Sequence, residues 1–179
     1  IREMGISDIR LFGFDSFEGL PETAKDEDEG KWANVDLKCE YELTREYLTL
    51  HGVDWSRIHL IKGWFSDTLT PQLCEDIDLR KVSCVMVDSD LYSSAKTALE
   101  FCAPLIQDHC IMFFDEYYHN DPRFADCRIG ERRAWEEFRA EHPEFQVQEY
   151  GQYSSESLIL LVSRRHDLTS SRSDTFSSG

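Results

Sequence analysis

The sequence predicts one α/β domain with a mainly parallel sheet, helices on both faces of that sheet and an antiparallel hairpin near its C-terminal end. Short apolar runs alternate with segments of helical periodicity, which is typical of parallel strands joined by helices. The third and fourth runs are almost continuously apolar, as expected for strands that are covered on both faces. A chain of 179 residues fits a single domain of this class.

Six apolar runs are the candidate strands. In chain order they cover residues 8–14, 57–62, 82–87, 110–114, 145–149 and 158–162. The last two runs flank Gly151, and we expect them to form the antiparallel hairpin that closes the sheet.

Three helices are predicted between the strands. Residues 91–106 give the clearest signal, because apolar side chains recur there along one helical face. Another helix covers the region of Leu43 to Leu50 and ends at Gly52. A third lies around Trp135 and ends before Pro143.

The remaining segments are polar. The acidic run at residues 26–29 is interpreted as a solvated loop. Residues 163–179 are rich in serine and lack periodicity, so we expect a disordered tail after a domain that spans residues 1–162.

The composition limits the classes of function. The formal net charge is -16, which disfavours binding to nucleic acid or to an anionic membrane surface. No apolar run approaches the roughly 18 residues that span a bilayer, and no signal-like segment opens the sequence, so we expect a cytoplasmic protein. The six cysteines contain no CxxC pair and are interpreted as free, mostly buried thiols without a metal.

Acidic residues follow each of the first four predicted strands, where ligands of parallel α/β sheets gather. Asp88 and Asp90 follow the third strand, and Asp115 and Glu116 follow the fourth. Such a group of hard oxygen ligands suits Mg²⁺. The alternative is that these acids cap helices, with Asp90 at the N-terminus of the helix that begins near Leu91.

The ends of the first two strands suggest a nucleoside site. An acid at the position of Asp15, just after a strand, can accept hydrogen bonds from both hydroxyls of a ribose. A turn or helix-capping role for Asp15 is the alternative. Trp64 and Phe65 offer a flat apolar wall for an adenine ring, although core aromatics give the same pattern. Lys62 and His119 are interpreted as solvated surface residues.

Four strings together resemble the macrocin O-methyltransferase family, whose members use S-adenosylmethionine and a metal ion to methylate hydroxyl groups of sugars in natural products. In chain order the strings are LFGFDSFEGLPE (11–22), KGWFSDTL (62–69), VDSDLYSSAKTA (87–98) and FDEY (114–117). The resemblance extends from residue 11 to residue 138 and implies a Rossmann-like methyltransferase fold.

The resemblance implies roles for the acids that follow the third and fourth strands. Asp88 and Asp115 match metal ligands of the family, and Glu116 stands where the family usually has a further aspartate ligand. Asp90 matches the acid proposed as general base.

The resemblance also implies which residues hold the cofactor. They lie in two segments, at the ends of the first and second strands: Asp15, Ser16 and Phe17, and then Gly63, Trp64, Phe65 and Ser66. The expected cofactors are therefore S-adenosylmethionine and Mg²⁺.

Several expectations follow for the whole protein. The acceptor is a hydroxyl group of a small molecule, with a sugar as the first candidate, and related enzymes tend to self-associate. The family's first strand, with its glycine-rich turn, is missing before residue 8, so the sequence is expected to be a piece of a longer protein or an N-terminally incomplete domain. In the usual strand order that strand lies between the first and third strands predicted here.

Two alternatives remain open. One is a methyltransferase-like binding module that is catalytically inactive. The other is a nucleotide-sugar glycosyltransferase, because Asp88-Ser89-Asp90 also matches the DxD signature of such enzymes. A binding measurement distinguishes the three hypotheses. An active methyltransferase should bind S-adenosylmethionine, a glycosyltransferase should bind a nucleotide sugar, and the inactive module should bind neither.

Overall fold

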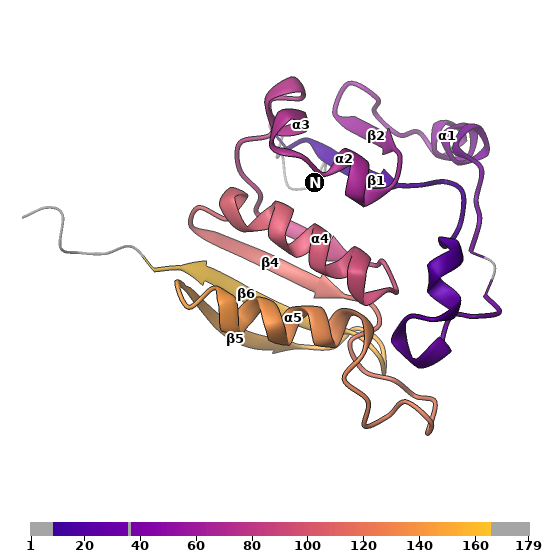
Figure 1. Ribbon diagram of the computed structural model, residues 1–179. Coiled ribbons are helices and arrows are strands. Elements are labelled where there is room, and N and C mark those ends of the chain that lie inside the picture. The colour runs from indigo at the N-terminus through magenta and orange to yellow at the C-terminus, as the bar shows by residue number, and fades with distance from the viewer. Residues whose placement is uncertain (1–8, 36, 166–179) are drawn as a thin grey trace, which may run out of the picture.

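The computed structural model describes residues 9–35 and 37–165, and it confirms the α/β class (Figure 1). The strands are β1 (Leu11–Asp15), β2 (Ile58–Lys62), β3 (Cys84–Val87), β4 (His109–Phe114), β5 (Phe145–Gly151) and β6 (Leu158–Arg164). The helices are α1 (Tyr41–Leu50), α2 (Phe65–Thr68), α3 (Pro71–Asp76), α4 (Tyr92–Cys102) and α5 (Gly130–Glu141). Short 3-10 turns are η1 (Glu22–Lys25), η2 (Asp28–Gly30) and η3 (Ala103–Leu105). Residues 1–8 lie outside the described residues, so the expectation of a missing first strand is not tested there.

The strands form two separate sheets within the described residues. β1 pairs with β2 in parallel, and the other sheet has the order β3-β4-β6-β5. β3 and β4 are parallel, while β6 runs antiparallel to β4 and β5, which confirms the predicted hairpin. β1 and β3 share no hydrogen-bonded pairing in the described part of the chain, and this is the position where the sequence predicts an absent strand.

Helices α4 and α5 cover one face of the larger sheet (Figure 1). The core between them contains Phe114 and Leu160 from the strands and Leu99, Trp135 and Phe138 from the helices. These side chains are buried because they alternate on one side of β4 and β6 and recur along one side of each helix.

The opposite face of the larger sheet differs from the prediction that helices cover both faces. Cys84, Met86 and Ile111 point to that side and are exposed among the described residues. The six cysteines are free thiols, as predicted, but only Cys102 and Cys110 are buried. The expectation of burial is wrong for Cys84, which lies on this uncovered face, and for the exposed Cys39, whereas Cys74 and Cys127 are partly buried.

The predicted solvated loop at residues 26–29 is wrong in part, because Asp28 is only 8 % exposed. One oxygen of its carboxylate accepts a hydrogen bond from the backbone N–H of Tyr92 at 2.8 Å, and the other accepts one from Gly130 at 2.8 Å. Glu27 accepts a hydrogen bond from the backbone N–H of Ser93 at 2.6 Å. The first N–H groups of a helix lack partners within the helix, so these acids cap α4 and hold the start of α5.

β6 continues past the predicted domain end at residue 162. The Arg164 side chain donates to the backbone oxygens of Ala103 and Ile106, at 2.7 Å each. Residues 166–179 of the predicted serine-rich tail lie outside the described residues. In the described ranges, no helix has the length and apolar character needed to cross a membrane.

Candidate functional site

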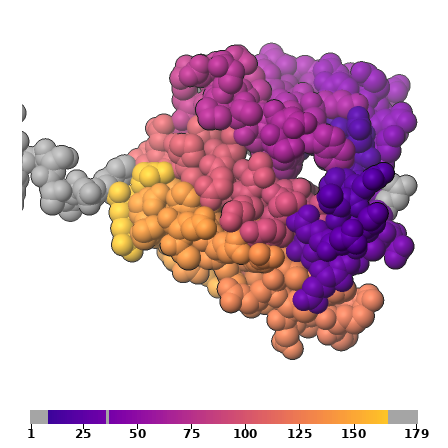
Figure 2. Space-filling view, in the orientation of Figure 1, coloured from indigo at the N-terminus to yellow at the C-terminus, as the bar shows by residue number. Residues whose placement is uncertain are grey.

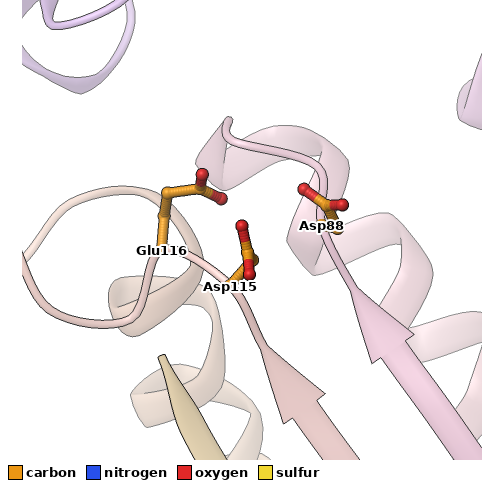
Figure 3. A group of neighbouring side chains, drawn as sticks. All are labelled: Asp88, Asp115 and Glu116. Atoms are coloured by element: carbon orange, nitrogen blue, oxygen red, sulfur yellow. The ribbon is translucent and has the colours of Figure 1, made fainter. Parts of the chain in front are cut away.

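Three acidic side chains converge at the carboxyl ends of β3 and β4 (Figure 3). Asp88 follows β3, and Asp115 and Glu116 follow β4. Because β3 and β4 are parallel and Val87 pairs with Phe114, the residues after these strands leave the sheet at the same edge. One carboxylate oxygen from each side chain lies within 4.8 Å of the other two. We refer to Asp88, Asp115 and Glu116 as the acid cluster.

The electrostatics of the acid cluster suit a cation. Burial raises the pKa of Glu116 to about 8, and the charges of Asp90, Glu131, Asp115 and Asp88 act in the same direction. Burial also raises the pKa of Asp88, followed by the charges of Asp115 and Asp15. Neighbouring carboxylates repel each other when ionised, and a divalent cation between them removes that repulsion.

The donor atoms of the acid cluster also fit a divalent ion. The buried Oε2 of Glu116 makes no hydrogen bond in the described part of the chain, so one ligand oxygen is unused. Carboxylate oxygens are the ligands that Mg²⁺ and Mn²⁺ prefer. Glu116 thus places a carboxylate oxygen near those of Asp88 and Asp115, and its role as a metal ligand stays a prediction.

Asp90 lies beside the acid cluster in a left-handed backbone conformation, with φ of 60°. Burial raises the pKa of Asp90 to about 6, the charge of Asp88 adds to the increase, and Lys31 opposes it. The helix-capping alternative for Asp90 loses its main support, because Asp28 and Glu27 accept the hydrogen bonds from the first N–H groups of α4. A strained acid with a pKa near neutrality is typical of a catalytic site.

Tyr153 reaches the acid cluster from the loop between β5 and β6. Its hydroxyl donates a hydrogen bond to Oδ1 of Asp115, and its ring lies 6.1 Å from that of Phe113. The fully buried Ser157 fixes the loop, because its hydroxyl oxygen accepts hydrogen bonds from the N–H groups of Tyr153 and Ser154 at 2.8 Å. Tyr153 thus orients Asp115.

His119 and Lys31 form a second group near the cluster. His119 is 7 % exposed, so its interpretation as a solvated surface residue is wrong. The ammonium of Lys31 lies 3.0 Å from Nδ1 of His119, and burial lowers the pKa of this imidazole. Lys31 and His119 are 88 residues apart in the sequence. The hydrogen bonds of Asp28 hold the segment that contains Lys31 against the starts of α4 and α5, and this brings Lys31 close to His119. Lys62 is exposed, as expected, with its ammonium 3.7 Å from Glu18.

The two predicted cofactor segments lie side by side at the carboxyl end of the smaller sheet. The N–H of Gly63 donates to the backbone oxygen of Asp15 at 2.9 Å. The side chain of Asp15 accepts a hydrogen bond from Phe17 N–H at 2.5 Å through Oδ1, which is the predicted turn alternative. Asp15 also raises the pKa of Asp88, so this segment and the acid cluster face the same edge.

The individual side chains of these segments are arranged as follows. Phe17 is buried and packs edge-on against Tyr41, with ring centroids 5.0 Å apart. The Ser16 hydroxyl donates to the backbone oxygen of Gly19 at 3.0 Å. Trp64 is the residue before α2, and Phe65 and Ser66 are its first two residues. Ser66 is exposed, and the two aromatic side chains are half-buried.

The sequence interpretation missed Glu131, Tyr153 and Lys31. Glu131 is fully buried and accepts hydrogen bonds from the N–H groups of Ser89 and Glu116. An acid in the first turn of a predicted helix is a signal that would have drawn attention to Glu131. Nothing in the local sequence marks Tyr153 or Lys31, because their partners are distant along the chain.

The sequence matches the family model described as Macrocin-O-methyltransferase (TylF) over residues 1–148. One curated relative is the 8-demethyl-8-(2,3-dimethoxy-alpha-L-rhamnosyl)-tetracenomycin-C 4'-O-methyltransferase of Streptomyces olivaceus. It is 28% identical over 123 residues, which are 65% of this chain and 45% of the relative. The chain thus spans less than half of that relative's length.

Two solved structures support the fold. The O-methyltransferase NovP superimposes with a TM-score of 0.70 and 19% identity, covering 92% of this chain and 63% of NovP. The calicheamicin methyltransferase CalS11 gives a TM-score of 0.62 and 22% identity, covering 88% of this chain and 61% of CalS11. Both similarities extend over most of the described α/β arrangement.

Proposed function

The chain belongs to the macrocin O-methyltransferase family, and we propose that it takes part in methyl transfer from S-adenosylmethionine to a hydroxyl group of a small molecule, assisted by a divalent cation. The observation that carries this proposal is the convergence of Asp88, Asp115 and Glu116, with ligand oxygens within 4.8 Å of one another, beside Asp90.

The acid cluster would hold the cation, Mg²⁺ in the first instance. When bound, such an ion favours ionisation of an acceptor hydroxyl by stabilising negative charge on its oxygen. Tyr153 donates to Oδ1 of Asp115, which leaves the other oxygen of that carboxylate for a ligand role. The unused Oε2 of Glu116 supports the same assignment.

Asp90 is the proposed general base. Without a bound cation its pKa is raised to about 6, so Asp90 is ionised at neutral pH and can accept a proton. The proton moves from the acceptor hydroxyl to a carboxylate oxygen of Asp90. S-adenosylmethionine would supply the methyl group: the acceptor oxygen would bond to the methyl carbon as the bond from that carbon to sulfur breaks, with S-adenosylhomocysteine as the second product.

The cofactor would lie at the ends of β1 and β2. The second oxygen of Asp15 is not used in its turn with Phe17 and is available for a ribose hydroxyl. Phe17 is packed against Tyr41, so its contribution is to shape the turn of Asp15 and Ser16. Gly63, Trp64, Phe65 and Ser66 would line the adenine side.

We propose a sugar hydroxyl as the acceptor. The Streptomyces olivaceus relative is named for methylation of a rhamnosyl tetracenomycin, and CalS11 is a TDP-rhamnose 3'-O-methyltransferase. Membership of an O-methyltransferase family argues against the DxD glycosyltransferase alternative. The inactive binding module is the remaining competitor, and the following experiment distinguishes it.

The test measures transfer of a labelled methyl group from S-adenosylmethionine to rhamnose-bearing acceptors, with Mg²⁺ and after chelation. We expect transfer that stops on chelation and returns with Mg²⁺. Asp90→Asn should lower the rate by about 10²- to 10⁴-fold, since it removes the base. The control Asp76→Asn makes the same chemical change at an exposed position of α3 and should leave the rate unchanged.

Three results would contradict parts of the proposal. Transfer that persists in chelator excludes the cation. A rate for Asp90→Asn equal to that of Asp76→Asn removes Asp90 from the mechanism. Absence of S-adenosylmethionine binding, together with absence of transfer, favours the inactive module.

A further inference from the structure

Glu131 is an acid with 0 % exposure, in the first turn of α5. A carboxylate is rarely buried completely unless it is paired, because its desolvation is costly. The partners of Glu131 are two backbone groups. Its Oε1 accepts a hydrogen bond from Ser89 N–H at 3.1 Å, and its Oε2 accepts one from Glu116 N–H at 3.1 Å.

These two N–H groups belong to the two loops that form the acid cluster. Ser89 lies between Asp88 and Asp90, and Glu116 follows Asp115. The side chain of Glu131 therefore bridges the end of β3 to the end of β4.

The backbone around Glu131 is shaped for this close approach. Gly130 has φ of 54°, and a Cβ atom at this position would lie 2.8 Å from the backbone oxygen of Asp90. The N–H of Gly130 donates to Asp28, which also caps α4. A glycine at the start of α5 thus lets the helix contact the loop of residues 88–90 directly, and Glu131 follows it into the space between the two loops.

We propose that Glu131 is a positioning residue of the acid cluster: its bridge between Ser89 and Glu116 sets the spacing of the loops that carry Asp88, Asp115 and Glu116. This inference rests on the proposed cation site. Groups that orient the ligands of a metal ion contribute about 10- to 100-fold to its affinity. Glu131 does so through backbone N–H groups rather than through the ligand side chains.

The test compares Glu131→Gln with the wild-type protein and with Glu141→Gln, which makes the same change at the exposed end of α5. Glutamine keeps one acceptor oxygen and turns an NH₂ group toward the other N–H, so one of the two loops loses its partner. Mn²⁺ affinity is measured by electron paramagnetic resonance. We expect about a 10- to 100-fold loss for Glu131→Gln and no change for Glu141→Gln.

Amide hydrogen exchange, followed by NMR at Ser89 and Glu116, is the second readout. The wild-type protein should protect both amides, and Glu131→Gln should lose protection at one or both. If Glu131→Gln does not fold, Glu131→Asp is used, with the same expectation because the shorter side chain cannot span both loops. Rapid exchange of both amides in the wild-type protein would overturn the inference.

The outcomes separate this inference from the proposed function. Mn²⁺ binding to the wild-type protein with unchanged affinity in the folded Glu131 variant overturns the positioning role alone. If the wild-type protein binds no Mn²⁺, the cation proposal fails. Amide exchange then decides the role of Glu131, and unchanged protection at both loops in the variant rejects it.

Discussion

Asp28 is a buried acid that joins three distant segments of the chain. Its carboxylate accepts hydrogen bonds from Tyr92 and Gly130, which lie 64 and 102 residues further along the sequence. Both bonds satisfy N–H groups at helix N-termini, where negative charge is also favoured by the helix dipole. The segment that follows Asp28 contains Lys31, so this anchoring brings a cation close to Asp90.

Asp28→Ala should lower the free energy of unfolding by about 1–3 kcal/mol, because it leaves two helical N–H groups without their partner. The measurement is chemical denaturation followed by circular dichroism. Asp26→Ala is the matched control, since Asp26 is an exposed acid two residues earlier in the same run. Equal stability of the two variants would show that the Asp28 bonds contribute nothing measurable.

A simple physical difference separates the site residues that were predicted from the sequence from the residues whose roles were not predicted. Asp88, Asp115 and Glu116 follow apolar strands, so their shared position at one sheet edge can be inferred from strand direction alone. Asp28 and Glu131 act through partners on other elements, and an acidic run or a first-turn glutamate does not identify those partners. Their burial is set by tertiary packing.

Helix α5 connects the candidate site to the rest of the core. Its first turn supplies Glu131, its middle packs Trp135 and Phe138 into the core, and it ends before His142. His142 links the helix to its surroundings, with Nε2 3.2 Å from Glu100 of α4 and Nδ1 3.1 Å from Glu144. The Arg164 guanidinium also lies 3.7 Å from Glu144.

The free energy of unfolding should fall as pH rises above the ordinary histidine pKa of about 6.5, because the pKa of His142 is raised in the folded protein. Burial acts to lower the pKa of His142, but hydrogen bonds with Glu144 and Glu100 outweigh it, and the pKa is raised above 6.5. A group whose pKa is higher in the folded state stabilises the protein below its unfolded pKa, and that stabilisation is lost as pH rises through the folded pKa.

Denaturation at several pH values checks this expectation. His142→Gln should make the fall with pH less steep, and Glu100→Gln should do so to a smaller extent because one of the two carboxylate partners is lost. A residual fall remains in both variants, because the raised pKa of Glu116, about 8, also lowers stability as pH rises. A profile of His142→Gln that keeps the wild-type slope would assign the pH dependence to other groups.

The helices and strands that could be predicted from the sequence are likewise those set by a local pattern of apolar residues. The strands and the helices α1, α4 and α5 were predicted because apolar residues recur there over several turns or form continuous runs. The short helices α2 and α3 were not, since four and six residues carry too little periodicity. The turn η2 contains Asp28, which accepts hydrogen bonds at the starts of α4 and α5, so the sequence of η2 taken alone predicts only a loop.

The described chain has one well-packed part and one loosely packed part. The larger sheet with α4 and α5 contains the buried core. β1, β2 and α1 contain no buried residue among those described, and Leu43, Tyr47 and Leu50 of α1 are exposed. The space-filling view shows an opening between the indigo N-terminal segment and the magenta elements (Figure 2).

Native-state hydrogen exchange should therefore be faster in β1, β2 and α1 than in β4, β6 and α5. Local opening requires less free energy where few apolar side chains are buried. Mass spectrometry of peptic fragments measures this difference. Equal protection of the two groups of elements would contradict the division into a well-packed and a loosely packed part.

The proposed chemistry requires the acid cluster to bind a cation, and Mn²⁺ binding tests this requirement most directly. Electron paramagnetic resonance should detect one site per chain in the wild-type protein and in the exposed control Asp76→Asn. Asp115→Asn should weaken binding by at least about tenfold, because it removes a charged ligand between Asp88 and Glu116. Equal binding by the wild-type protein and Asp115→Asn, or no binding by either, would contradict the assignment of the acid cluster as a cation site.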